Sequence, residues 1–146
     1  MSARAVVPVS LDPVDLSRQH HALRVEIAEL RGMIDSRLAP QRNDRYHAML
    51  AVLVGRLGDR LKSHFEAEEC DGYLTALAAD PALADDLERL GAAHATLVAD
   101  ALHLSDVLRA ADAPPDAVAR VLRWLDLLQR HEADEHDVVQ RHLTRV

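Results

Sequence analysis

Apolar residues recur every three or four positions along most of this chain, which is the period of an amphipathic α-helix. Prolines divide the pattern into segments, because proline starts or ends a helix more readily than it continues one. They stand at positions 8, 13, 40, 81, 114 and 115. Four helices are therefore predicted, over residues 13–38, 43–70, 82–111 and 116–142. We also expect an irregular arm at 1–12 and a short helical piece at 73–79.

The apolar stripe of each predicted helix is interrupted by polar residues. Residues 64–69 read HFEAEE and residues 131–135 read HEADE, so each segment places a histidine and a glutamate four residues apart on one helix face. Single histidines interrupt the stripes of the first and third helices. The interrupting residues are His20, His64, Glu68, His94, His131 and Glu135. These side chains are predicted to face the core.

Short connections favour an all-α, up-down-up-down four-helix bundle spanning residues 13–146. In that topology the start of the first helix, the end of the second, the start of the third and the end of the fourth lie at one end of the molecule. The six interrupting residues all fall in these parts of their helices. The sequence therefore predicts that they converge at one level of the bundle.

Burying two carboxylates among leucines without partners would cost several kcal/mol each. Two divalent or trivalent cations remove this cost, because carboxylates can bridge them while neutral imidazoles complete the ligand set. Iron, manganese or zinc suits such mixed ligands. Any one of these histidines, taken alone, is more often an ordinary core residue. Two His-x-x-x-Glu pairs level with two further histidines instead favour a site for two metal ions.

Neighbouring residues leave alternatives open. His21 competes with His20 for the position on the first helix, and His20 is preferred because it shares a stripe with Leu23 and Ile27. Tyr73 is a further candidate ligand. Cys70 is expected to be a small apolar filler of the core. Four other polar residues near the pairs are expected to lie on the solvated surface. The four are Glu66, Glu69, Glu132 and His136.

Composition narrows the class of protein. The net charge of −7 argues against nucleic acid as a partner, because phosphate binding requires a basic face. The sequence contains neither a basic run suited to an anionic membrane nor a stretch of about 20 apolar residues that could span one. A single cysteine precludes an intramolecular disulfide, and the first residues lack the apolar core of a secretory signal. A cytoplasmic protein is expected.

The order His, His-x-x-x-Glu, His, His-x-x-x-Glu resembles that of the hemerythrin-like (HHE cation-binding) family, over nearly the whole chain. The resemblance implies two iron ions bridged by Glu68 and Glu135, with an oxo or hydroxo group between them. It also implies that His20 and His64 hold one iron, and that His94 and His131 hold the other. The small ligand would be dioxygen, peroxide or nitric oxide.

The sequence departs from oxygen-carrying members of that family at two positions. They have a second histidine one turn after the first on the third helix, where this chain has Val98, and an aspartate five residues after the last histidine, where it has His136. Simple oxygen carriage is therefore less favoured than turnover of peroxide or nitric oxide by a di-iron oxidoreductase. The alternative is a non-enzymatic oxygen or iron sensor that acts through a partner. The sequence leaves open whether the protein is a monomer or a homodimer.

Overall fold

The computed structural model describes residues 13–35, 44–71 and 77–144, and this part of the chain is mostly helical, with no strand. It comprises four long helices and one short 3₁₀ helix, η1, which precedes α4. Their bounds are α1 (Pro13–Asp35), α2 (Asp44–Asp71), η1 (Pro81–Leu83), α4 (Ala84–Arg109) and α5 (Ala117–Thr144). The predicted all-α fold is confirmed.

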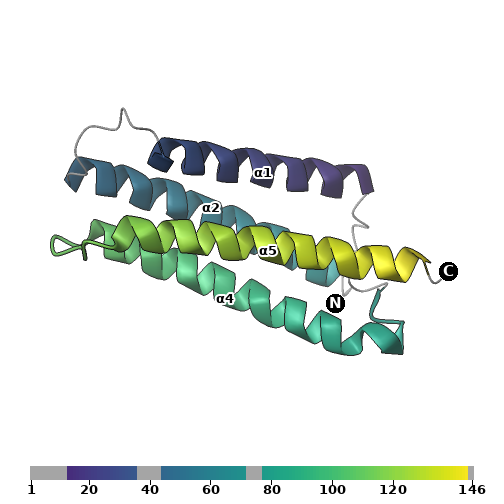
Figure 1. The fold of residues 1–146 in the computed structure, drawn as a ribbon. Coiled ribbons are helices and arrows are strands. Elements are labelled where there is room, and N and C mark those ends of the chain that lie inside the picture. The colour runs from purple at the N-terminus through teal and green to yellow at the C-terminus, as the bar shows by residue number, and fades with distance from the viewer. Residues whose placement is uncertain (1–12, 36–43, 72–76, 145–146) are drawn as a thin grey trace, which may run out of the picture.

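Successive long helices run in opposite directions, as Figure 1 shows. The start of α1, the end of α2, the start of α4 and the end of α5 therefore lie toward one end of the bundle. This is the up-down-up-down arrangement that the short connections predicted. None of the described helices is both long enough and apolar enough to cross a membrane.

The core consists of two apolar clusters with a polar layer between them. The larger cluster draws on all four long helices, whereas the smaller contains Leu77, Leu83, Leu90 and Val138. Along α4 the smaller cluster ends at Leu90 and the larger begins at Leu97, with buried His94 between them. Along α5 the larger cluster ends at Leu128, before His131 and Glu135. The polar residues thus occupy one continuous level of an otherwise apolar interior.

Helices α2, α4 and α5 are joined by buried polar contacts and by a close backbone approach. Trp124 Nε1 on α5 donates to the Leu97 carbonyl oxygen on α4 (3.0 Å), and Ser105 Oγ donates to the Ala51 carbonyl oxygen on α2 (2.9 Å). A Cβ atom added to Gly58 would lie 2.8 Å from the Ala101 Cβ. Glycine at this position therefore lets α2 and α4 pack closely.

Helix α1 packs with an apolar stripe, but cavities lie along both of its sides. Its stripe contributes Leu23, Ile27, Leu30 and Ile34 to the larger cluster. Cavities of about 350 and 370 Å³ lie between α1 and α2, and one of about 570 Å³ lies between α1 and α5. Ion pairs help to hold the helix in place, including one between Arg31 Nη2 and Asp126 Oδ1 (2.7 Å).

Helix boundaries differ from the predicted ones by a few residues. The third long helix was expected from residue 82, but its first turn is the 3₁₀ helix η1, and α4 begins at Ala84. Asp80 Oδ1 accepts a hydrogen bond from the Ala82 amide (3.0 Å), which satisfies one of the free amides at this start. The expected arm at 1–12 lies outside the described residues, and so do residues 73–76 of the expected helical piece at 73–79.

Candidate metal centre

The six residues predicted from the sequence meet in the polar layer. Helix α1 supplies His20, α2 supplies His64 and Glu68, α4 supplies His94, and α5 supplies His131 and Glu135. Five of them are buried, with exposed fractions between 0% for Glu68 and 6% for His64 and His131. The His20 side chain is 30% exposed. The layer is therefore enclosed on three helices and more open at α1.

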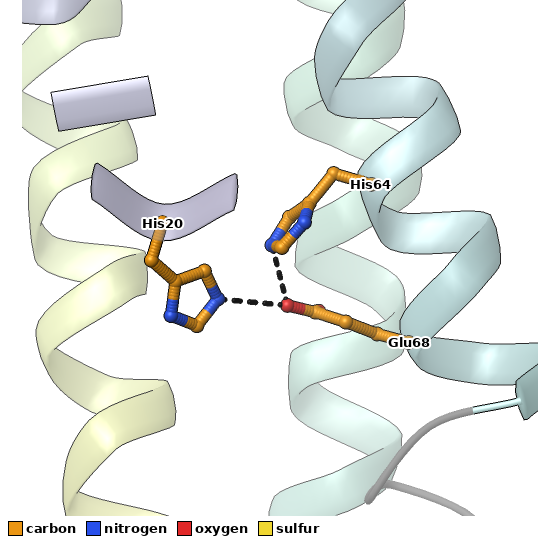
Figure 2. A group of neighbouring side chains, drawn as sticks. All are labelled: His20, His64 and Glu68. Carbon is orange, nitrogen blue, oxygen red and sulfur yellow. Dashed lines mark hydrogen bonds and ion pairs between the residues drawn. The ribbon is translucent and has the colours of Figure 1, made fainter. Parts of the chain in front are cut away.

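One group of ligand-type atoms lies between α1 and α2. His20 Nε2 is 3.1 Å from Glu68 Oε1, and His64 Nε2 is 2.5 Å from the same oxygen. Figure 2 shows the two rings pointing at this oxygen from opposite helices. One donor atom from each of the three residues lies within 4.8 Å of the other two, which is compact enough to hold one ion.

The second group lies between α4 and α5. His131 Nε2 and His94 Nε2 are 3.3 and 3.6 Å from Glu135 Oε2. Their donor atoms also lie within 4.8 Å of one another. Each group thus offers two imidazoles and one carboxylate.

The two carboxylates also reach across to the opposite group. Glu68 directs Oε1 at His20 and His64, while its Oε2 lies 3.7 Å from His94 Nε2. Glu135 directs Oε2 at His131, while its Oε1 lies 3.8 Å from His20 Nε2. Each carboxylate therefore presents one oxygen to each group, as a bridging carboxylate would.

Several buried atoms in this layer lack a hydrogen bond, which tests whether cations fit there. Among the described residues, no hydrogen bond reaches Glu68 Oε2, His94 Nε2 or His131 Nε2. Leaving such groups unsatisfied costs about 1–3 kcal/mol each. Metal coordination would satisfy all three, because each has a lone pair directed into the layer. The donor set and its burial fit a pair of transition-metal ions.

The buried carboxylates raise the pKa of two histidines in the layer. The hydrogen bond with Glu68 is the main cause that raises the pKa of His20. Burial lowers the pKa of His94, but the carboxylates of Glu135 and Glu69 outweigh it, so that this pKa is also raised. Burial raises the pKa of Glu132, which stands beside His131. The layer therefore favours positive charge at its centre.

Three residues that the sequence interpretation did not select position the histidines. Gln19 Oε1 accepts from His64 Nδ1 (2.8 Å), and Glu69 Oε1 accepts from His94 Nδ1 (3.1 Å). The Phe65 ring lies flat against His94, with the centroids 3.8 Å apart. Glu69 lies on a solvated face, as expected, with its side chain 47% exposed, but its hydrogen bond with His94 was not predicted. In the sequence, these residues are marked only by standing next to predicted ligands. That adjacency does not tell which way their side chains point.

The structure also places the remaining candidates. His21 is exposed and lies outside both groups, whereas His20 faces Glu68. Tyr73 and the side chain of Cys70 lie outside the described residues. Glu66 and His136 are exposed, as expected. Val98 packs against the larger apolar cluster and supplies no donor to the layer.

Comparison with known families agrees with this geometry. The chain matches the hemerythrin HHE cation-binding domain over residues 14–143, a range that contains all six polar residues. No curated protein matched the chain, and no solved structure did. With that match covering most of its length, the chain belongs to the hemerythrin HHE cation-binding domain family.

Proposed function

We propose that this protein holds two iron ions in the polar layer and uses them to bind or turn over a small oxidant such as peroxide, nitric oxide or dioxygen. His20 and His64 would hold one ion, His94 and His131 the other, and Glu68 and Glu135 would bridge them. The observation that carries the proposal is the orientation of the two carboxylates, each with one oxygen toward each histidine pair.

Charge and burial support a pair of cations. Glu68 and Glu135 are 0% and 4% exposed, and four imidazoles surround them. Two ionised carboxylates in an apolar interior require positive partners, and two cations provide more compensation than two protons. Bound iron would supply electrons and open coordination positions for the small ligand.

The remaining residues would bind, orient and exclude water. Val98 gives α4 an apolar side chain one turn after His94, so each group has two imidazoles. Unlike a centre with an extra imidazole on one ion, this arrangement favours reaction at both ions over simple carriage. Phe65 covers one face of His94 and lies edge-on to His131, which keeps that side apolar.

Metal analysis is the first test. Freshly purified protein should contain about two irons per chain, or should take up two after anaerobic loading with ferrous iron. Its near-ultraviolet spectrum should gain an iron-dependent band. Fewer than two after loading would contradict the proposal.

Two histidine variants on α5 give a matched pair for this test. His131→Ala removes a buried donor of the second group, whereas His136→Ala changes an exposed residue five positions later. Iron content should fall in the first variant and stay at the wild-type value in the second. Consumption of peroxide or nitric oxide should follow iron content.

The position of α1 supports a second candidate, a non-enzymatic sensor of iron or oxygen. This helix supplies only His20 to the layer and is bordered by cavities on both sides. Metal binding would fix His20 and hold α1 against the other helices. A sensor should show slower hydrogen exchange in α1 on iron loading and no catalytic consumption of peroxide or nitric oxide. An oxidoreductase should show multiple turnovers.

A further inference from the structure

The outer nitrogens of His64 and His94 have chemically different partners. His64 Nδ1, in the group between α1 and α2, donates to the neutral amide oxygen of Gln19 (2.8 Å). His94 Nδ1, in the group between α4 and α5, donates to the carboxylate of Glu69 (3.1 Å). Each group has two imidazoles and one glutamate, and the groups also differ in burial, because the His20 side chain is 30% exposed.

We propose that Gln19 and Glu69 are positioning residues that make the two metal positions unequal, with the tighter position at His94, His131 and Glu135. This inference rests on the proposed function. Both acceptors keep the proton on Nδ1 and leave the Nε2 lone pair for a metal. A carboxylate acceptor also increases the electron density on the ring, and so makes Nε2 a stronger ligand than an amide does.

The helices fix this difference. Glu68 and Glu69 are consecutive on α2, so their side chains point about 100° apart around the helix axis. Glu68 therefore enters the layer while Glu69 crosses to α4. Gln19 precedes His20 on α1 and crosses to α2 in the same way.

Nearby charges do not cancel the difference. Glu132 adds negative charge near His20, but its Oε2 lies 3.8 Å from Arg24 Nε, which offsets that charge. The Glu69 side chain is 47% exposed, so water weakens its effect on His94. We therefore expect the lower end of the range seen for such outer partners, about tenfold in metal affinity.

The test is an anaerobic titration of metal-free protein with Fe²⁺ in competition with a coloured chelator. Wild type should show two dissociation constants. Glu69→Gln should raise the lower constant about tenfold and leave the other within a factor of about two. Gln19→Glu should lower the higher constant, a gain of affinity that a merely structural role would not produce.

Glu66→Gln is the control, because it removes the same charge from an exposed position of α2, two residues from both His64 and Glu68. It should leave both constants within a factor of about two of wild type. Circular dichroism of each variant would establish that the helices are intact. Gln19→Glu tests the inference from a different helix if Glu69→Gln folds poorly.

The possible outcomes distinguish a failure of this inference from a failure of the proposed function. If wild type binds fewer than two Fe²⁺, the proposed function fails and the inference with it. If wild type binds two but Glu69→Gln and Gln19→Glu change neither constant, or change both equally, the inference alone is overturned. A shift of one constant per variant, in opposite directions, would support it.

Discussion

The ring of Phe65 lies against the ring of His94, with centroids 3.8 Å apart and planes inclined by 2°. Phe65 is 5% exposed and belongs to the larger apolar cluster, while His94 belongs to the polar layer. One aromatic side chain of α2 therefore joins the core to the candidate metal centre and restricts the orientation of a predicted ligand on α4.

Replacing Phe65 should destabilise the metal-free protein. Phe65→Ala leaves a cavity and removes the stacking, so we expect the free energy of unfolding to fall by about 3–5 kcal/mol. Phe65→Leu keeps most of the volume and should cost less. Urea denaturation of both variants, with unchanged m-values, would measure this. A loss below about 1 kcal/mol in Phe65→Ala would show that the ring is not part of a tight core.

Two glycines should respond to alanine with opposite signs. In Gly58→Ala the new Cβ would meet the Ala101 Cβ at 2.8 Å, so α2 and α4 must move apart and stability should fall. At Gly91 a Cβ would meet nothing within 4 Å, so Gly91→Ala should stabilise α4 by about 0.5–1 kcal/mol through helix propensity. Thermal unfolding of the two variants gives the comparison. Equal stabilisation by both would contradict the close approach of the helices.

Removing metal should lower stability in a concentration-dependent way. At free metal of about 100 times the dissociation constant, each site adds about 2.7 kcal/mol to the free energy of unfolding. For a chain of this size, 1 kcal/mol corresponds to about 2–4 °C in Tm. Chelation that empties both sites should therefore reduce Tm by about 10–20 °C, and added Fe²⁺ should restore it. The Tm of a His64→Ala, His131→Ala double variant should change with neither treatment. If its Tm changed as much as that of the wild type, the metal responsible would bind outside the polar layer.

The decrease in the free energy of unfolding at acidic pH should depend on Asp86. Its carboxylate accepts from Arg89 Nη1 (2.7 Å), and that hydrogen bond is the main cause that lowers the pKa of Asp86 below its ordinary 3.8. A lowered folded pKa stabilises the fold above the unfolded value, and this stability disappears as the pH falls through the folded value.

Asp86→Asn should therefore flatten the decline in stability below about pH 4. The control is Asp85→Asn, an exposed change in the same first turn of α4, which loses the same helix-dipole contribution but no such bond to Arg89. Urea midpoints between about pH 2.5 and 6 would measure both. Identical curves for the two variants would exclude a specific role for the Asp86–Arg89 pair.

The sequence by itself determined the four helices, their alternating directions and the convergence of six polar residues. Apolar periodicity and proline positions are local signals, and short connections permit few topologies. Within a helix, a four-residue spacing fixes which side chains share a face. For these reasons His64 with Glu68, and His131 with Glu135, could be paired before any coordinates existed. Their role as metal ligands stays a prediction.

Only the tertiary structure decided which neighbour of each selected residue faces inward. Consecutive residues differ by about 100° around a helix, so the apolar stripe favoured His20 over His21, and the rotation of α1 against α2 and α5 settled the choice. The same rotation brings Gln19 to His64, and the packing of α2 on α4 brings Glu69 to His94. Such contacts join helices far apart in sequence, and their geometry follows from side-chain packing across the whole core rather than from any local pattern.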